Sequence, residues 1–574
     1  MDYSIKICGE AGQGIQTIGE TLGKVFSQTG YYVFTHQDYE SRIRGGHNFY
    51  QIRFSDRPVY ASKKRIDILI SLDREGLILH EKELNKNGIL VYDSKALKYT
   101  LPENKPGYFD IPFETLAIEH GGNKIMSNVV AVGAVLGMLG MDIDVLLTII
   151  KDTFKKKGEA IVKANIDSAM AGYDYASRNC PRCSFILSTK STPKVLINGV
   201  EAIGMGAISA GCQFYTAYPM TPSTGILNFM AEKALEYGIV VEQAEDEIAA
   251  INMAIGASFG GVRAMTGTSG GGFALMVEGL SLAGMTETPV VIALGQRPGP
   301  ATGFPTRTEQ ADLNFALYAA HGEFPRILFA PGSPQQALYL TNKAFDLAEK
   351  YQVPAIILFD QYLADCEWTY DRLERDKLIY RDYRLRSDAL KTMKEYKRHA
   401  FTDNGITPLA MPGASEHLVV TDSDEHDEEG HIVEDAETRI KMVQKRFLKK
   451  FPLLQKEISP PLLYGYENPE IVIVCWGSTF GVVKECVDLL ADKFRIAMLH
   501  FSEIWPFPLR DQFDYVRLLE DVRITISVEH NATGQFERLL RTEIGYRVNQ
   551  RINRFDGRPF TVDELSEKII EILG

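Results

Sequence analysis

The chain has 574 residues, of which 45% are hydrophobic and 24% are charged, and its formal net charge is −13. This length is several times that of a single domain of about 100–200 residues, and the composition excludes a disordered, collagen-like or disulfide-scaffold chain. The excess of acidic residues argues against non-specific nucleic-acid binding, because neutralising phosphates requires a basic surface.

The sequence predicts neither a membrane span nor a signal peptide. The longest apolar stretch, near residues 129–141, is shorter than the about 18 residues that a span needs, and Asp142 follows it. The N-terminal Met-Asp-Tyr-Ser lacks the basic and apolar regions of a signal peptide. We therefore expect a cytoplasmic protein with no membrane partner.

The cysteines form an odd and sparse set, which predicts reduced thiols in a reducing compartment. They are Cys8, Cys180, Cys183, Cys212, Cys366, Cys475 and Cys486. Only Cys180-Pro-Arg-Cys183 has ligand-like spacing, and a zinc site or iron–sulfur cluster normally needs four ligands. We interpret this pair as a linker turn, with half of a metal site or a redox pair as the alternatives.

Residues 1–176 alternate short apolar strands with amphipathic helices, the pattern of a doubly wound α/β domain. The first strand, 3–8, runs into Gly9-Glu-Ala-Gly-Gln-Gly14, and a helix with one apolar face follows. Further strands are expected at 31–35, 66–71 and 88–92. The pattern then lapses, which marks residues 177–193 as a linker.

A second α/β unit is expected at 194–384, and a third at 466–574 begins with an apolar strand and a glycine turn. The strands of the second unit are expected at 213–216, 239–242, 262–266, 290–294, 326–330 and 355–359. The intervening residues 385–465 contain the acidic run Asp422–His431. We interpret them as a surface excursion with a solvated acidic loop, rather than as a divalent-ion site.

Four features that could bind a ligand or take part in catalysis follow strands of the second unit. The first is Tyr218-Pro-Met-Thr-Pro-Ser-Thr224, in which two prolines hold Thr221 in a stiff turn. Pro222 fits the first position of a helix, which makes Thr221 a natural N-cap. Alternatively, its hydroxyl and the helix N–H groups face a cleft and bind an anion.

The second feature is an acidic helix start. Glu245, Asp246 and Glu247 crowd the first turn of a helix, where acids complement the helix dipole by about 0.3–1 kcal/mol each. Glu247 also opens an apolar helix at a strand end, so its carboxyl could be buried with a raised pKa.

The remaining two features are loops that could approach a ligand. Thr266-Gly-Thr-Ser-Gly-Gly-Gly272 combines hydroxyls with glycines that permit a close backbone approach. The loop from Gly295 to Arg307 carries Arg297 and Arg307, whose planar guanidinium groups suit a carboxylate or phosphate. All four features lie at the carboxyl ends of strands, where open α/β sheets bind ligands.

With these motifs the chain resembles the α subunit of the 2-oxoacid:ferredoxin oxidoreductases, in the form that has a γ domain fused ahead of the α part. The stretch from Tyr218 is similar to the family's Tyr-Pro-Ile-Thr-Pro turn, with Met220 in place of Ile. The glycine loop also recurs, with Gly271 where Pro is more usual. Glu247, followed by Gly256, is similar to the cofactor-activating glutamate helix of thiamine-diphosphate enzymes.

The likeness covers nearly the whole chain. Gly9–Gly14 and Arg42-Ile-Arg-Gly-Gly-His47 resemble the γ domain, and Val528–Gln535 resembles a transketolase-like C-terminal domain. The resemblance implies three Rossmann-like units in an α/β chain: the γ domain, a thiamine-diphosphate pyrimidine-binding domain and the transketolase C-terminal-like domain.

The resemblance implies coenzyme A-dependent oxidative decarboxylation of a 2-oxoacid, with electrons passing through iron–sulfur clusters to ferredoxin, and often the reverse reaction. Carried over by position, Glu247 hydrogen-bonds the aminopyrimidine of thiamine diphosphate and promotes formation of its ylid. Glu245 is the alternative if the register differs by two. Pro219 packs against the cofactor, and Thr268 and Ser269 are further cofactor-binding candidates.

The same carry-over implies the residues that bind substrates. Tyr218, Thr221 and Arg297 would orient the 2-oxoacid, and Arg307 would neutralise a second carboxylate or a phosphate. The candidates for coenzyme A lie in the γ domain: Gly9, Gly12, Gln13, Gly14 and Arg44.

The sequence lacks two motifs that the whole enzyme needs: the Gly-Asp-Gly and Asn anchor of Mg²⁺-diphosphate, and a four-cysteine cluster set. In this family both reside on a β subunit, so the resemblance implies that Mg²⁺ and the [4Fe-4S] cluster belong to that partner. This chain would supply no metal ligand, and an (αβ)₂ assembly is expected. Acidic ferredoxin would dock mainly on β, in keeping with the charge of −13 here.

The fused architecture favours 2-oxoglutarate, with succinyl-CoA as product, and pyruvate or a broad specificity is the alternative. A 2-oxoglutarate site needs a cation for the distal carboxylate, for which Arg307 or Arg44 could serve. Two other functions stay open: a non-redox thiamine-dependent lyase or transferase, and a non-catalytic nucleotide-binding subunit.

Overall fold

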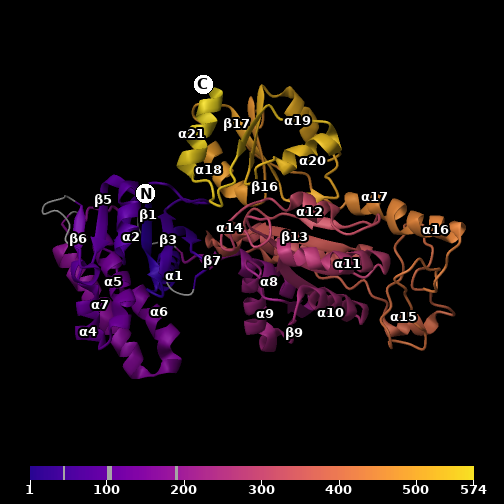
Figure 1. Cartoon of the computed structure of the whole chain (residues 1–574), viewed down its shortest axis with the longest axis horizontal. Coiled ribbons are helices and arrows are strands. Elements are labelled where there is room, and N and C mark those ends of the chain that lie inside the picture. The colour runs from indigo at the N-terminus through magenta and orange to yellow at the C-terminus, as the bar shows by residue number, and fades with distance from the viewer. Residues whose placement is uncertain (43–44, 100–106, 182, 188–191) are drawn as a thin grey trace. The chain divides into compact units, whose positions relative to one another are not determined.

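The computed structural model describes all residues except 43–44, 100–106, 182 and 188–191 (Figure 1). It divides into two compact units. Unit 1 comprises Met1–Ile197, Cys366–Leu373 and Thr561–Glu567, and unit 2 comprises Asn198–Asp365, Glu374–Phe560 and Lys568–Gly574. Strands of the described residues form three sheets, one in unit 1 and two in unit 2, and helices accompany each. The predicted α/β class is confirmed, with three sheets that helices accompany.

Unit 1 is built around β1 (Asp2–Ala11), which pairs parallel with β4 (Ile66–Ser71) and antiparallel with β3 (Gly45–Ser55). The strand order is β6-β5-β4-β1-β3-β2-β14-β7. The other strands of this sheet are β2 (Tyr32–Asp38), β5 (Leu84–Tyr92), β6 (Tyr108–Asp110), β7 (Val195–Ile197) and β14 (Trp368–Tyr370). The sequence analysis did not predict strand β3. Alternate residues of this strand are apolar, and they complete the core.

The long apolar stretch of unit 1 is a core helix. Helix α5 (Ser127–Leu139) packs against α7 (Glu159–Asn179) so closely that a β-carbon at Gly133 would lie 2.0 Å from the carbonyl oxygen of Ala169. Within the described residues, no helix alone has the length and apolar character to span a membrane. Helix α4 (Phe113–Gly121) reaches that length and apolar character only together with Lys124–Leu139, and the two are bent by 119° relative to each other.

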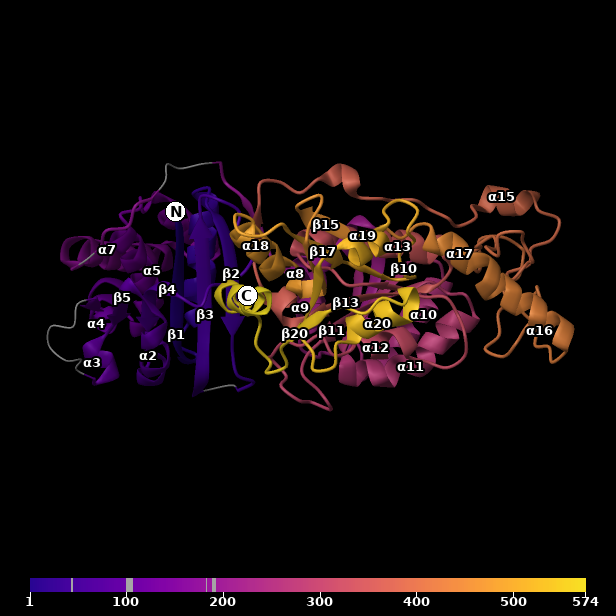
Figure 2. The same cartoon turned by 90° about the horizontal axis from the view of Figure 1, so that it is seen from above.

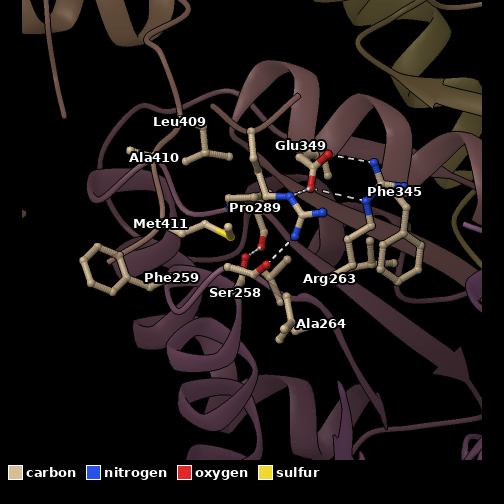
Figure 3. Close-up of a pocket in the computed structure, with 16 residues that line it drawn as sticks. Ser258, Phe259, Arg263, Ala264, Pro289, Phe345, Glu349, Leu409, Ala410 and Met411 are labelled. Carbon is tan, nitrogen blue, oxygen red and sulfur yellow. Dashed lines mark hydrogen bonds and ion pairs between the residues drawn. The ribbon is translucent and has the colours of Figure 1, made fainter. Parts of the chain in front are cut away.

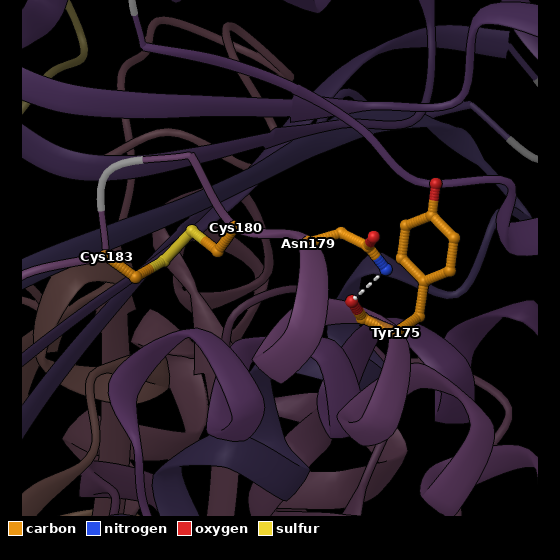
Figure 4. The surroundings of a disulfide bond; sticks show 4 residues. All are labelled: Tyr175, Asn179, Cys180 and Cys183. Carbon is orange, nitrogen blue, oxygen red and sulfur yellow. Dashed lines mark hydrogen bonds between the residues drawn. A yellow bond between two sulfur atoms is a disulfide. The ribbon is translucent and has the colours of Figure 1, made fainter.

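The two cysteines in the turn after α7 are not the reduced thiols that the sequence predicted. Cys180 and Cys183 form a disulfide there (Figure 4), because the turn brings their Cα atoms to 5.7 Å, within disulfide range. Asn179, the last residue of α7, donates from Nδ2 to the carbonyl oxygen of Tyr175 at 2.8 Å. The other five cysteines are buried.

The second sheet positions the candidate site. Its order is β18-β12-β13-β11-β10-β8-β9, and every neighbouring pair is parallel except β12–β18. The strands are β8 (Cys212–Ala217), β9 (Val240–Gln243), β10 (Arg263–Ser269), β11 (Val290–Gln296), β12 (Ile327–Phe329), β13 (Pro354–Asp360) and β18 (Glu503–Trp505). Six of them match the predicted strands within a few residues. The carboxyl ends of β9, β8, β10 and β11 therefore lie side by side.

Helices pack on this sheet and carry small or apolar residues toward it. They include α9 (Thr224–Tyr237), α10 (Glu247–Phe259), α11 (Gly270–Met285) and α12 (Leu313–Tyr318). Helix α12 lies beside α11 (Figures 1 and 2), where the rings of Phe273 and Phe315 pack with centroids 5.1 Å apart. One hydrophobic core continues from these helices into the third sheet.

The third sheet has the order β15-β17-β16-β19-β20. Its strands are β15 (Leu462–Gly465), β16 (Ile471–Trp476), β17 (Ile496–Phe501), β19 (Ile524–Glu529) and β20 (Gln550–Asn553). Gln310 joins the second sheet's loops to this sheet, since its Nε2 donates to the carbonyl oxygen of Trp476 at 2.9 Å. The last strand of the second sheet, β18, follows β17 directly in sequence.

The expected surface excursion contains a buried ion cluster instead of only solvated charges. Glu287 lies two residues after the end of α11 and pairs with Lys445 and Lys450. Nζ of Lys450 lies 2.5 Å from Oε1 of Glu287. His399 Nδ1 lies 3.2 Å from the same carboxyl group. All four side chains are at most 1% exposed. The segment packs because each buried charge has a partner.

Candidate functional site

The turn after β8 is the first of the predicted elements at the strand ends. Tyr218 is 40% exposed, and Pro219 and Thr221 are partly buried. Thr221 is not the N-cap that the sequence predicted. The N–H groups of Ser223 and Thr224 donate instead to the carbonyl oxygen of Met220, at 2.9 and 3.2 Å, and α9 begins only at Thr224. The hydroxyl of Thr221 is thereby left outside the helix cap.

Glu247 is the first residue of α10, after β9. Asp246 caps this helix, and its Oδ1 accepts from the N–H of Ala249 at 2.7 Å. The Glu247 side chain is buried, and its Oε1 has no hydrogen-bond partner within the described residues. Burial raises the pKa of Glu247, and the charge of Asp246 adds to the rise. Glu245 is exposed, so Glu247 is the acid that the fold turns inward.

The glycine loop after β10 closes around this carboxyl group. A β-carbon at Gly272 would lie 2.3 Å from Glu247 Oε1 and 2.1 Å from Thr268 Oγ1. Only glycine therefore lets the carboxyl and the hydroxyl converge there. Ser269, whose side chain is fully buried, has an Oγ with no partner within the described residues. The sequence pointed to this loop but did not single out Gly272.

Arg297 follows β11 and reaches across to the β8 turn. Its Nη1 donates to the carbonyl oxygen of Thr221 at 3.0 Å, and burial lowers the pKa of its guanidinium. Two acids that the sequence analysis missed lie further along the same loop. Burial raises the pKa of Asp312 to about 6 and that of Glu309 to about 7, and the charge of Asp312 adds to the second rise.

Arg307 lies on the same loop, between Arg297 and these two acids. Its β-carbon would be 3.1 Å from a β-carbon at Gly557, and its N–H donates to the carbonyl oxygen of Phe304 at 3.2 Å. These contacts place Arg307 beside the segment that follows β20. The structure thus brings Thr221 and Arg297 together, and Glu247 and Thr268 together, whereas Arg307 lies beside Gly557 in the C-terminal region.

The glycine-rich loop of unit 1 is stabilised by its own glutamine. Gln13 accepts from the N–H of Glu10 at 2.7 Å through Oε1 and donates from Nε2 to the carbonyl oxygen of Leu72 at 3.2 Å. Gly14, with φ 78°, precedes α1 (Ile15–Gln28), and the N–H groups of a helix's first turn suit an anion. Arg44 lies outside the described residues.

A pocket lies at the amino ends of β10 and β11 (Figure 3). Arg263, which begins β10, pairs there with Glu349, with Nη2 and Oε2 2.7 Å apart. These charges satisfy each other, in contrast to the unpartnered carboxyl oxygen of Glu247. No group of three or more His, Cys, Asp or Glu side chains suited to a metal ion occurs in the part of the chain that the structure describes.

Comparison with known proteins shows to which class of protein this chain belongs. Residues 205–445 match the model of the thiamine-diphosphate-binding domain of pyruvate flavodoxin/ferredoxin oxidoreductases. Residues 4–175 match the model named pyruvate ferredoxin/flavodoxin oxidoreductase, and residues 469–565 match core domain II of pyruvate:ferredoxin oxidoreductase. The candidate site at Glu247 thus lies in a thiamine-diphosphate-binding domain.

A Sulfolobus protein named 2-oxoacid:ferredoxin oxidoreductase subunit alpha is 34% identical, with 100% of this chain and 97% of that protein covered. The chain belongs to this family of 2-oxoacid:ferredoxin oxidoreductases, which are enzymes of the EC 1.2.7 type. The 2-oxoglutarate synthase subunit KorA of Methanocaldococcus jannaschii is 36% identical over 54% of this chain and 83% of that protein. Because the relatives are named alpha subunits, a β subunit partner is implied.

One solved structure matches the whole chain. It is the 2-oxoglutarate:ferredoxin oxidoreductase from Magnetococcus marinus, with 2-oxoglutarate, coenzyme A and succinyl-CoA bound. The identity is 30%, the TM-score is 0.90, and all of both chains is covered. The residues of the present site fit a thiamine cofactor, because Glu247 offers a buried, unpartnered carboxyl oxygen beside a backbone that only glycine permits.

Proposed function

We propose that the chain is the α subunit of an enzyme that oxidises 2-oxoglutarate with coenzyme A to succinyl-CoA and CO₂ and passes two electrons to ferredoxin, reversibly. The observation that carries this proposal is the full-length likeness to a 2-oxoglutarate enzyme at a TM-score of 0.90. The KorA relatives, which are 2-oxoglutarate synthase subunits, support the same substrate.

Glu247 is the proposed cofactor-activating residue. When bound, thiamine diphosphate supplies a nucleophilic carbon and an electron sink for decarboxylation. The buried carboxyl of Glu247, with its raised pKa, can hold a proton at Oε1 and donate it in a hydrogen bond to a ring nitrogen. Thr268, Ser269 and Pro219 would line the same cofactor.

The 2-oxoacid would bind at the meeting point of two loops. Arg297 is held by its hydrogen bond to Thr221, so its remaining N–H groups can receive a carboxylate in a fixed orientation. The hydroxyls of Thr221 and Tyr218 would complete the orientation of the substrate. The distal carboxylate of 2-oxoglutarate would require a second cation, for which Arg307 and Arg44 remain the candidates.

Coenzyme A is proposed to contact unit 1 at its glycine-rich loop. Gly9, Gly12 and Gly14 open the backbone, and Gln13 fixes the loop ahead of the N-terminus of α1. The positive end of a helix dipole favours the phosphates of such a substrate.

The partner β subunit would supply Mg²⁺, the diphosphate anchor and the [4Fe-4S] cluster, and it would receive ferredoxin. We expect an (αβ)₂ assembly in the cytoplasm. A second substrate range is favoured by one observation: the Sulfolobus relative, at 34% identity, is named for 2-oxoacids in general. A broad specificity that includes pyruvate is therefore the alternative.

The test is anoxic reduction of a viologen dye by the co-expressed α and β chains, with thiamine diphosphate and coenzyme A. We expect strong, coenzyme A-dependent reduction with 2-oxoglutarate and much weaker reduction with pyruvate. Glu247→Gln should abolish it, whereas Glu245→Gln, the exposed acid two residues earlier, should not. Equal rates with both acids would favour broad specificity, and turnover by the α chain alone would overturn the proposal.

A further inference from the structure

Another cavity lies where the excursion of residues 385–465 meets the helices of the second sheet. Its volume is about 280 Å³, close to the lower end of the about 300–1,000 Å³ of small-molecule sites. The end of α11, the loop after α12 and the excursion line it. Leu282, one of the lining residues, comes ten residues after Gly272, which is about 15 Å along the helix. The cavity is therefore separate from the site at Glu247.

The excursion contributes two arginines that one carboxyl group holds. Glu425 Oε1 accepts from Arg446 Nη2 at 2.7 Å, and Glu425 Oε2 accepts from Arg439 Nη1. Arg439 lies on α16 (Ala436–Val443), and Arg446 follows in the π-helical turn Gln444–Lys449. One carboxylate neutralises only one of two guanidinium groups. This side of the cavity thus keeps a positive charge in a fixed orientation.

Arg446 is the buried member of the pair. Its side chain is 5% exposed, and its Nε has no hydrogen-bond partner within the described residues. A polar group that is withdrawn from water costs free energy unless a partner reaches it. The side chain of Arg439 is 54% exposed, and among the described residues only its Nη1 has a side-chain partner. The two arginines can therefore receive a carboxylate between a buried and an accessible donor.

The cavity also has an apolar part, which Leu282 of α11 and Phe324 of the loop after α12 form. The ring of Phe324 lies against α11, since a β-carbon at Gly284 would be 2.5 Å from its Cγ. The loop is tied to the helix as well, because the N–H of His321 donates to Ser281 Oγ at 3.1 Å. An apolar group of a ligand can bury its surface here.

Two carboxyl groups complete the lining. Glu278 belongs to α11 and Glu323 to the loop after α12, so neither comes from the element that carries the arginines. Both are exposed, and neither carboxylate takes part in a hydrogen bond or an ion pair within the described residues. A carboxylate repels a second anion and receives an ammonium group. The charges of the cavity therefore suit a ligand with one negative and one positive end.

We propose that this cavity binds an α-amino acid with an apolar side chain. The carboxylate of the ligand pairs with the two arginines, its ammonium group pairs with the two lining acids, and its side chain packs on Leu282 and Phe324. A dicarboxylate such as 2-oxoglutarate brings its second negative charge to the acids and is excluded. The excursion thus builds a ligand site, and this inference does not depend on the proposed function.

Isothermal titration calorimetry of the αβ enzyme without substrates tests the proposal with three probes. L-Leucine carries both charges, 4-methylpentanoate lacks the ammonium group, and 3-methylbutylamine lacks the carboxylate. We expect leucine to bind at least about tenfold more tightly than either analogue, because each analogue loses its charged hydrogen bonds at one end.

Variants assign the binding to this cavity. Arg439→Gln should weaken leucine binding about tenfold, because it removes one guanidinium group and leaves the buried one paired. Lys441→Gln, on the same helix but outside the cavity, is the matched control. The double variant Glu278→Gln/Glu323→Gln should also weaken leucine binding about tenfold, yet strengthen that of 4-methylpentanoate, which no longer meets two carboxylates. Urea unfolding of each variant checks that the fold is kept.

Each result decides the inference. It is overturned if leucine does not bind, or if 4-methylpentanoate binds to the wild-type chain as tightly as leucine does. Equal leucine affinities in Arg439→Gln and Lys441→Gln would also overturn it, since the binding would then lie elsewhere. Because binding is measured without turnover, these outcomes are independent of whether the enzyme oxidises 2-oxoglutarate.

Discussion

A β-carbon on Gly272 would lie 2.3 Å from Oε1 of Glu247, so the last residue of the glycine loop and the acid that faces it are sterically coupled. The contact joins the start of α11 to the start of α10, which are separate in sequence but adjacent at the carboxyl edge of the second sheet. A glycine is therefore required here by a neighbour's side chain and not by its own backbone angles.

Gly272→Ala should consequently disable the site. The added methyl group must displace Glu247 or the loop, so we expect kcat/KM for the 2-oxoacid to fall at least 100-fold, about 2.7 kcal/mol of transition-state stabilisation. Gly271→Ala is the control, because a β-carbon at Gly271 meets nothing within 4 Å. Steady-state dye reduction by both variants makes the comparison. Similar losses in the two would show that the loop tolerates no side chain, independently of Glu247.

Arg297→Lys should raise KM for the 2-oxoacid by about 10–100-fold, while kcat changes less. A lysine ammonium cannot both donate to the carbonyl oxygen of Thr221 and present a planar pair of N–H groups to a carboxylate. Kinetics over a range of 2-oxoacid concentrations measure the effect, and Arg541→Lys, on an exposed helix face, is the control. A normal KM in Arg297→Lys would remove this residue from the substrate site.

Gln13→Ala should weaken coenzyme A binding without affecting the 2-oxoacid. The change removes the hydrogen bonds to the N–H of Glu10 and the carbonyl oxygen of Leu72, so the loop ahead of α1 loses its fixed shape. We expect KM for coenzyme A to rise several-fold at unchanged KM for 2-oxoglutarate. Gln16→Ala, which loses only a contact with Glu20 on the surface of α1, should leave both constants unchanged. If both KM values rose together, the loop would not be a separate coenzyme A site.

The buried ion cluster predicts a pH dependence of stability. Desolvation lowers the pKa of Lys445 from 10.5 to about 8, in spite of its contact with Glu287. Between these values the unfolded chain binds more protons than the folded one, so this lysine makes the free energy of unfolding rise with pH. The slope is at most about 1.4 kcal/mol per pH unit for one proton.

Lys445→Met should remove that slope between pH 8 and 9.5, as followed by urea unfolding with circular dichroism. Lys441→Met, an exposed lysine on the same segment that pairs with Glu437, should keep it. A slope that survives in Lys445→Met would assign it to other groups. The test concerns only the difference between variants, because other groups of the chain titrate as well.

The part of the candidate site around Glu247 could be predicted because its structure follows local rules. Strand, turn and helix start succeed one another at Glu247 and at the glycine loop, and parallel strands bring their carboxyl ends to one edge. Asp312 and Glu309 escaped prediction because contacts with distant residues position them. Gln310, between them, bonds to Trp476, which lies 166 residues further along the chain.

The same reason explains the other departures. Charged residues such as Lys445 and Glu287 are expected on the surface, yet they meet across 158 residues and are buried together. Thr221 has the sequence of a helix cap, but the carbonyl of Met220 takes that role in the actual turn. Local patterns thus predicted where the site lies, and long-range contacts decided which atoms are available in it.

The hydrogen bonds of Gln310 also bear on how such a chain can change in evolution. Because Gln310 bonds to Trp476 and His530, the third sheet fixes the position of a loop on the second sheet. Exchanging residues 466–574 for those of a relative would therefore move the backbone of this loop, and with it the side chains of Glu309 and Asp312. A substitution in the third sheet can thus change the candidate site through the position of a loop alone.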